Sequence, residues 1–127
     1  MFISFPMKFI PLFCLPLLLV LFAQTAQAQS ERLPKVMTDT LAVTGVCKMC
    51  QARIEEATMY QRGVKLAHWD KDAQQLRVVY KTKKITREEI CQAVAKVGHD
   101  TELVKATDEA YQELPGCCRY RDGVEVH

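Results

Sequence analysis

A chain of 127 residues, of which 49% are hydrophobic and 25% are charged, has room for one ordinary globular domain. The formal net charge is only +2, and no long block of Lys and Arg occurs. This near-neutral balance argues against nucleic acid as a partner, because proteins that bind it carry clustered positive charge.

The first 28 residues have the pattern of a secretory signal peptide. A single positive charge precedes an apolar run from Phe9 to Ala23, and the run is followed by Ala26-Gln27-Ala28. The run is short for a membrane-spanning helix and is interrupted by two prolines, so a cleaved signal is favoured over a membrane anchor. We therefore expect residues 1–28 to be removed and the mature protein to be periplasmic or secreted.

Removal of the signal peptide leaves five of the six cysteines, which are Cys47, Cys50, Cys91, Cys117 and Cys118. An odd count in an exported protein means that at least one thiol is unpaired or bonds another molecule. Because exported proteins meet an oxidising environment, each of these thiols needs a reason to stay out of a disulfide.

The first half of the mature chain predicts a leader, a strand and a helix. Residues 29–38 are polar and contain a proline, which is typical of a flexible leader. Alternating β-branched and apolar residues predict a strand over Thr40–Val46. Apolar residues at helical intervals then predict a helix from Cys50 to about Gln61, which ends at Gly63.

The second half predicts a hairpin, a second helix and a last strand. Val64–Asp70 and Gln75–Tyr80 alternate in polarity and flank a short polar connection. A capping-box pattern opens the second predicted helix over Thr86–Val97. Thr101–Val104 is short but suits a final strand.

The resulting βαββαβ order predicts an α+β, ferredoxin-like fold, in which two helices cover one face of a four-stranded antiparallel sheet. We assign this domain to residues 39–105. Residues 106–127 form a C-terminal extension that contains Cys117 and Cys118 and is too polar to fold alone.

The CxxC motif of Cys47 and Cys50 is the main candidate site. The pattern places Cys47 in a loop and Cys50 at or near a helix start, where free backbone N–H groups and the helix dipole favour thiolate over thiol. Two such thiolates form a soft, open metal site. A plain disulfide between the two cysteines is the alternative interpretation.

Four further residues, two histidines, a tryptophan and Cys91, have predicted positions in this fold. In the ferredoxin-like topology the loops before the first helix and after the second lie at the same end of the sheet. His99 is therefore a neighbour of the CxxC loop and a candidate ligand, although a hydrogen-bonded loop histidine has the same pattern. We expect His68 on the open face of the sheet, Trp69 in the core, and Cys91 as a small, half-buried apolar residue of the second helix.

The adjacent cysteines Cys117 and Cys118 leave three alternatives open. They cannot readily bond each other without backbone strain, so they bond other cysteines or remain exposed. Alternatively, the tail folds back over the metal loop and adds one or two thiolates. Such a site would approach four sulfurs and suit zinc or a copper cluster.

These residues resemble the heavy-metal-associated domain of copper chaperones, of P-type ATPase metal-binding modules and of periplasmic mercury-binding proteins. The matching features are a strand ending in Cys47-x-x-Cys50, Gly63 before the second strand, and Gly98 after the second helix. The resemblance covers roughly residues 38–104 and departs from the family pattern in two places. One residue, where the family usually has two, separates Gly45 from the first cysteine, and a histidine occupies position 99, where the family often has an aromatic residue.

The resemblance implies a protein that holds a soft metal ion between Cys47 and Cys50 and exchanges it with a partner. Cu(I) is the favoured ion, while Hg(II) and Zn(II) can compete for thiolates. The implied partner is a metal-transporting membrane protein or another thiolate metal carrier, and two copies of the chain sharing one ion are an alternative assembly. No enzyme activity is implied.

Three other functions compete with a copper chaperone or scavenger. One is a mercury-binding or zinc-binding protein of a metal resistance system. Another is a thiol-disulfide oxidoreductase, because such enzymes also carry a CxxC motif at a helix start. This sequence, however, lacks the thioredoxin-type order of strands and helices and a proline facing the motif. The last is an interaction domain stabilised by disulfides.

Overall fold

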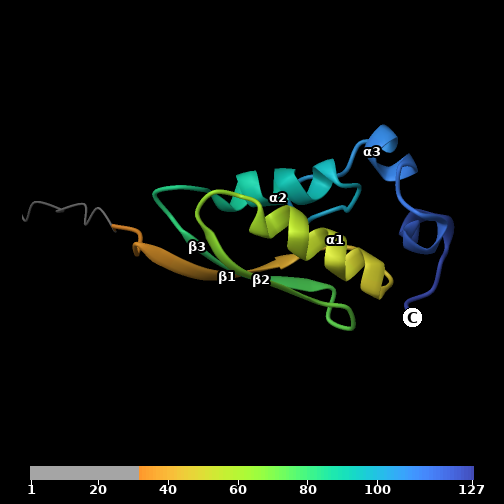
Figure 1. Ribbon diagram of the computed structural model, residues 1–127, viewed down its shortest axis with the longest axis horizontal. Coiled ribbons are helices and arrows are strands. Elements are labelled where there is room, and N and C mark those ends of the chain that lie inside the picture. The colour runs from red at the N-terminus through yellow and green to blue at the C-terminus, as the bar shows by residue number, and fades with distance from the viewer. Residues whose placement is uncertain (1–31) are drawn as a thin grey trace, which may run out of the picture. The chain divides into compact units, whose positions relative to one another are not determined.

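The computed structural model describes residues 32–127 of the chain (Figure 1). The predicted signal peptide, residues 1–28, lies outside the described residues, as do the first three residues of the predicted leader. In the described part, every helix is too short or too polar to cross a membrane.

Three antiparallel strands form the sheet in the order β1-β3-β2. They are β1 (Val36–Ala42), β2 (Val64–Asp70) and the central strand β3 (Gln75–Lys81).

The register of the strands builds the centre of the core. Leu76 of β3 pairs with Leu41 of β1 on one side and with Trp69 of β2 on the other. All three side chains are almost completely buried, so this row forms the sheet side of the core and confirms Trp69 as a core residue.

Two longer helices supply the other side of the core: α1 (Lys48–Met59) and α2 (Arg87–Lys96). Figure 1 shows both of them above the strands. The capping box predicted for the second helix is present. The Thr86 hydroxyl accepts from the Glu89 amide at 3.2 Å, and the Glu89 carboxylate accepts from the Thr86 amide at 2.8 Å.

The first strand begins earlier than predicted. We expected Thr40–Val46, whereas β1 is Val36–Ala42 and includes residues that we assigned to the flexible leader. The physical reason is Asp39, which is half-buried and whose carboxylate lies 3.4 Å from the guanidinium of Arg87. This ion pair allows a charged residue to take an inward position in the strand.

The prediction of a fourth strand over Thr101–Val104 is wrong for the described structure. Only one isolated bridge, between Val43 and Thr101, joins this segment to the chain that follows β1. Instead, the Thr101 amide donates to the Val104 carbonyl at 2.9 Å, and the Thr101 hydroxyl bonds the same carbonyl at 2.9 Å. This local turn uses groups that a strand ladder would need, so the sheet stops at three strands.

The C-terminal segment, residues 106–127, is folded against the domain. It contains the short helix α3 (Asp108–Gln112) and two 3₁₀ turns, Gly116–Cys118 and Tyr120–Asp122. Its fully or almost fully buried large side chains are Tyr111, Leu114 and Cys118.

Arg121 and Tyr120 anchor this segment to the loop after α2. The Arg121 guanidinium donates to the Asp100 carboxylate at 2.6 Å and lies 4.5 Å from the centre of the Tyr111 ring. The Tyr120 hydroxyl donates to the Gly98 carbonyl at 2.9 Å and accepts from the Asp100 amide at 2.8 Å. The segment is therefore held in place by polar contacts as well as by burial.

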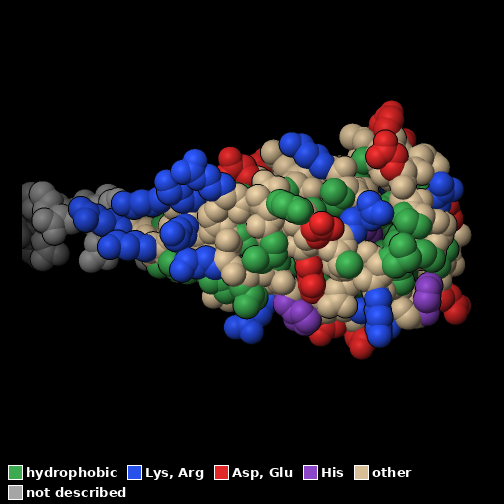
Figure 2. Space-filling model, viewed as in Figure 1, with side chains coloured by type: hydrophobic (Ala, Val, Ile, Leu, Met, Phe, Trp, Pro, Cys, Tyr) green, Lys and Arg blue, Asp and Glu red, His purple; other side chains and the backbone are tan. Residues whose placement is uncertain are grey.

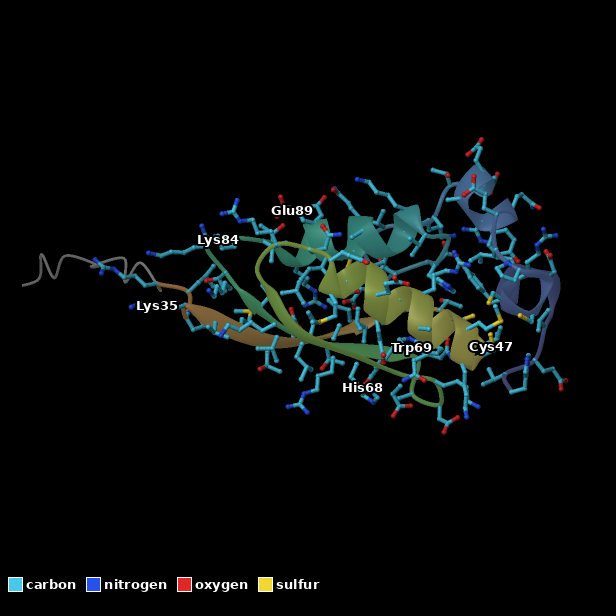
Figure 3. The ribbon with its side chains drawn as sticks, in the orientation of Figure 1. Lys35, Cys47, His68, Trp69, Lys84 and Glu89 are labelled. Carbon is cyan, nitrogen blue, oxygen red and sulfur yellow. The ribbon has the colours of Figure 1, made fainter. Side chains whose placement is uncertain are left out.

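Lys and Arg side chains gather at the end of the domain around Lys35 and Lys84 (Figures 2 and 3). Cys47 lies at the opposite end in Figure 3.

Candidate metal centre

The CxxC motif opens helix α1. Cys47 is the N-cap residue, with an extended backbone (φ −149°, ψ 174°), and Cys50 lies in the first turn. The helix begins at Lys48, two residues before the predicted start. Both cysteine side chains therefore lie at the helix N-terminus, where the free N–H groups favour negative charge.

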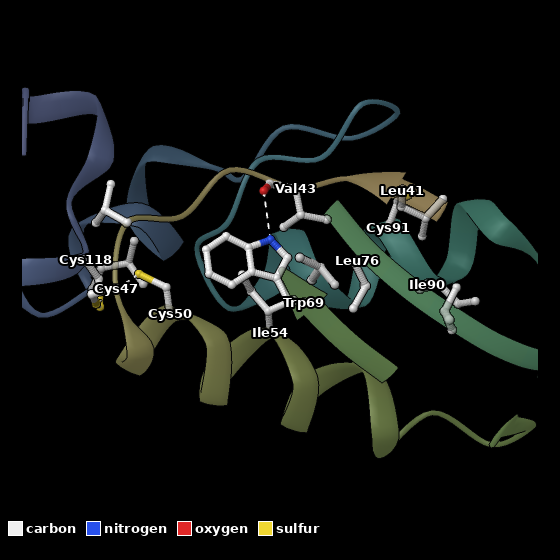
Figure 4. Close-up of a cluster of buried hydrophobic side chains, with 14 of the residues drawn as sticks. Leu41, Val43, Cys47, Cys50, Ile54, Trp69, Leu76, Ile90, Cys91 and Cys118 are labelled. Carbon is white, nitrogen blue, oxygen red and sulfur yellow. Dashed lines mark hydrogen bonds between the residues drawn. The ribbon is translucent and has the colours of Figure 1, made fainter. Parts of the chain in front are cut away.

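The C-terminal segment brings a third cysteine to this pair. The Cys47 sulfur lies 3.4 Å from the Cys50 sulfur and 3.5 Å from the Cys118 sulfur. All three sulfurs lie within 4.8 Å of one another. They are also buried, because Cys47 is 5% exposed and the other two are 0% exposed. Figure 4 shows the three side chains together, with Cys118 reaching the pair from the C-terminal segment.

Trp69 supports the loop that carries Cys47. Its indole N–H donates to the Val43 carbonyl at 3.0 Å (Figure 4), and its ring packs against Gly45. The Gly45 amide in turn donates to the side chain of Gln74 at 2.8 Å. The short loop between β1 and α1 is therefore fixed by the core beneath it, which holds Cys47 in position.

Replacing Gly45 with alanine is expected to destabilise this loop. A Cβ at Gly45 would lie 2.9 Å from two atoms of the Trp69 ring and 3.1 Å from the Cys50 Cβ. Overpacking of this kind costs about 1–3 kcal/mol. Gly116→Ala is the matched control, because a Cβ there meets no atom within 4 Å. Urea unfolding of both reduced variants checks the prediction, and equal losses of stability would contradict it.

The three thiols differ in acidity. Burial opposes the ionisation of Cys47, but the amide and thiol of Cys50 and the thiol of Cys118 outweigh it and lower the pKa of Cys47 to about 7. Burial raises the pKa of Cys50 and of Cys118. The site therefore favours one thiolate, on Cys47, beside two neutral thiols.

This difference predicts a titration near neutrality in the reduced, metal-free protein. The ultraviolet absorbance of one thiolate should appear with a midpoint of about pH 7, because Cys47 is protonated below that pH and ionised above it. The Cys47→Ser variant, measured in the same way, provides the baseline. A midpoint at about 8.5, the usual value for a free cysteine, would contradict the prediction.

His99 is buried beside the loop but lies outside the group of sulfurs. Its Nδ1 lies 2.9 Å from the Thr44 carbonyl oxygen, and its ring stacks on Tyr120 at 5.8 Å between ring centres. Burial lowers the pKa of His99, which favours the neutral ring. The structure thus places His99 as a hydrogen-bonded link between the loop and the C-terminal segment.

The other residues that the sequence analysis singled out lie outside the group of three sulfurs. Cys117 is exposed, and its sulfur lies 3.9 Å from the Cys118 sulfur. Cys91 is fully buried in α2 rather than half-buried. His68 is exposed and faces Glu55, whose carboxylate lies 3.2 Å from the imidazole.

Sequence reasoning missed Met49. This residue lies between the two motif cysteines, and its sulfur is 3.6 Å from the Cys117 sulfur. A methionine inside a CxxC motif was the available signal, because a thioether is also a soft ligand.

The fold and the cysteine group support a small metal-binding α+β domain. No protein-family model and no curated protein matches the sequence, but several solved structures share the fold. The chain is 26% identical to the CopZ metallochaperone, with a TM-score of 0.50, over 51% of this chain and 98% of that one. It is 25% identical to a copper-binding domain from HMA7, a P-type ATPase, with a TM-score of 0.50, over 53% and 92% of the two chains.

A third structure is similar in fold. Oxidized MerP from Ralstonia metallidurans CH34 is 24% identical, with a TM-score of 0.51, and the match covers 53% of this chain and 94% of that one. The chain is therefore similar to heavy-metal-associated domains, as the sequence resemblance predicted.

Proposed function

We propose that this protein binds a soft metal ion, Cu(I) before others, through the thiolates of Cys47, Cys50 and Cys118. The observation that carries the proposal is the buried group of three sulfurs, in which Cys47 and Cys118 are 71 residues apart in sequence yet adjacent in space. His99 is not assigned as a ligand, because its ring lies outside the group of three sulfurs. Its Nδ1 bonds the Thr44 carbonyl, and its buried Nε2 has no hydrogen-bond partner among the described residues.

The spacing of the sulfurs suits a metal ion. Three sulfurs around one ion at a bond length of about 2.3 Å stand about 4.0 Å apart in a trigonal plane. The Cys47 sulfur is now 3.4 Å and 3.5 Å from the other two, so a small outward movement would admit the ion. Thiolate ligands select Cu(I), and Hg(II) and Zn(II) compete for the same atoms.

The biological role that we propose is an exported copper chaperone or scavenger. The similarity to a metallochaperone and to a copper-binding ATPase domain supports the choice of copper. The signal-peptide pattern of residues 1–28 supports a periplasmic or secreted location. The partner would be a metal-transporting membrane protein or another thiolate carrier, whose incoming sulfurs replace Cys47 and Cys50 one at a time.

Burial of the cysteines affects this exchange. The C-terminal segment contributes Cys118 directly against Cys47 and leaves Cys47 only 5% exposed, so movement of that segment would open the ion to a partner's thiolate. The same burial argues against two copies of the chain sharing one ion through their CxxC loops. We therefore infer a protein that holds its ion more firmly than an exposed two-sulfur site would.

One observation favours a second candidate, a thiol-disulfide oxidoreductase. Cys47 has a pKa of about 7 and opens a helix, as the attacking cysteine of such an enzyme does. Reduction of insulin disulfides by the metal-free protein distinguishes the two functions. Measurable turnover that is lost in Cys47→Ser would favour the enzyme, whereas its absence together with tight metal binding supports the metal carrier.

Anaerobic purification followed by competition between Cu(I), Zn(II) and Hg(II) tests the proposed function. Elemental analysis and chelator titration would give the preferred ion and its affinity. If the reduced, folded protein takes up none of the three ions, the proposal is wrong.

Replacing Cys118 with serine tests the third ligand. Without its thiolate, the ion at Cys47 and Cys50 should keep two sulfur neighbours instead of three in X-ray absorption spectra of protein loaded with one equivalent of Cu(I). We expect the affinity to fall by at least about tenfold, since even outer-shell partners of metal ligands contribute 10–100-fold. Cys91→Ala is the control, because Cys91 is the one other buried cysteine in the described part of the chain. This substitution should change neither the number of sulfur neighbours nor the affinity for Cu(I).

A further inference from the structure

A chain of five sulfur atoms runs from the surface to the core at the end of the domain where Cys47 lies. Successive distances are 3.6 Å, 3.9 Å, 3.5 Å and 3.4 Å. In order, the atoms belong to Met49, Cys117, Cys118, Cys47 and Cys50. Figure 3 shows yellow sulfur atoms gathered around the labelled Cys47. The proposed site accounts for only the inner three.

The two outer sulfurs differ from the inner three in exposure. Met49 is 53% exposed and Cys117 is exposed, whereas Cys118 is 0% exposed. Met49 and Cys117 also line a shallow cavity on the surface, together with Cys47. A soft ion in solution would therefore meet the outer sulfurs first.

Ordinary packing does not explain the outer pair. A sulfur contact stabilises a protein core because it buries apolar surface area. The side chains of Met49 and Cys117 remain exposed, so their contact gains little stability in this way. The pair is instead formed by two unlike soft donors, a thioether and a thiol, from segments 68 residues apart. Both are ligands that select Cu(I) over hard ions.

We propose that Met49, Cys117 and Cys118 form a second, outer position for the same soft ion, with the Cys118 sulfur shared between the outer and inner positions. The proposal rests on the proposed function, because the inner position supplies the shared thiolate. It makes the protein a carrier of two Cu(I) ions and gives the second ion three sulfur ligands.

The charges are consistent with two ions. Four thiolates and two Cu(I) ions carry a net charge of −2, and Lys48 lines the same cavity. The neutral thioether of Met49 adds a ligand without adding charge. Binding displaces thiol protons into the solvent and changes no oxidation state.

Titration of the reduced full-length protein with Cu(I), against a competing chelator under anaerobic conditions, tests the outer position. The wild type should bind two equivalents. Met49→Leu, which keeps the size of the side chain, and Cys117→Ser should each bind one. Met59→Leu is the matched control, because Met59 is a similarly exposed methionine (47%) at the far end of the same helix, and it should still bind two.

The outcomes separate the outer position from the proposed function. A wild type that saturates at one equivalent, or Met49→Leu and Cys117→Ser variants that still bind two, would overturn the outer position while leaving the inner one intact. If neither the wild type nor the variants bind Cu(I), the proposed function itself fails. Circular dichroism of each variant confirms that the exposed substitutions leave the fold unchanged.

Discussion

Replacing both Cys47 and Cys50 with alanine is expected to abolish high-affinity binding of Cu(I) at the inner position, which leaves at most the one equivalent of the proposed outer position. The two side chains are the ligands at the start of helix α1, and their sulfurs lie 3.4 Å apart. Loss of an outer-shell partner costs about 10–100-fold in affinity, and loss of two direct ligands should cost much more. Chelator competition in the reduced state measures the effect.

The control for this double variant is Cys91→Ala. Cys91 is as buried as Cys50 but belongs to α2 and lies outside the sulfur group, so its replacement should leave Cu(I) affinity within experimental error. Thermal melts of the metal-free proteins establish that both variants are folded. If the double variant retained wild-type affinity, the ion would have to bind elsewhere and the assignment of the site would be wrong.

Replacing Trp69 with alanine is expected to cause the largest loss of stability. The side chain is 1% exposed and contacts Gly45, and its N–H pairs with the Val43 carbonyl. Removal of a buried tryptophan costs about 3–5 kcal/mol, which is a large part of the 5–15 kcal/mol that holds a small domain together. Urea unfolding of the reduced, metal-free protein measures it.

Two further substitutions sharpen this test. Trp69→Phe keeps an aromatic ring but leaves the Val43 carbonyl without its partner, so an intermediate loss of about 1–3 kcal/mol is expected. His68→Ala changes the adjacent residue on the exposed face of β2 and should fall within about 0.5 kcal/mol of the wild type. A Trp69→Ala variant as stable as His68→Ala would refute the supporting role of the indole.

The parts of the fold set by local sequence were predictable. The capping box of α2 depends on two residues three positions apart, and the core position of Trp69 follows from the alternation of β2. The CxxC motif at a helix start also follows from local pattern, because Cys47 ends an extended segment and a helical periodicity begins after it.

The parts set by distant contacts were not predictable. Asp39 precedes the strand predicted to begin at Thr40, and its pairing with Arg87 explains its place in β1. Thr101–Val104 has the composition of a strand, yet hydrogen bonds within the segment close it into a turn. In both cases the competing interaction is invisible to a pattern of apolar and polar residues.

The third sulfur shows the same limit within the site. Sequence alone treats Cys117 and Cys118 alike, since they are neighbours in a polar tail. The 3₁₀ turn at Gly116–Cys118 and the ion pair between Arg121 and Asp100 decide which of them faces inward. Cys118 is buried against Cys47, while Cys117 faces solvent beside Met49.

The joining of α1 to the C-terminal segment through Cys118 has a consequence for the lifetime of the protein. An ion held by Cys47, Cys50 and Cys118 would act as a cross-link between two remote parts of the chain. A ligand that binds only the folded state, and whose free concentration is about 1,000 times its dissociation constant, adds about 4.1 kcal/mol to the free energy of unfolding. Copper-loaded molecules would therefore outlast empty ones wherever proteases remove unfolded chains, and the amount of carrier would follow the supply of its cargo.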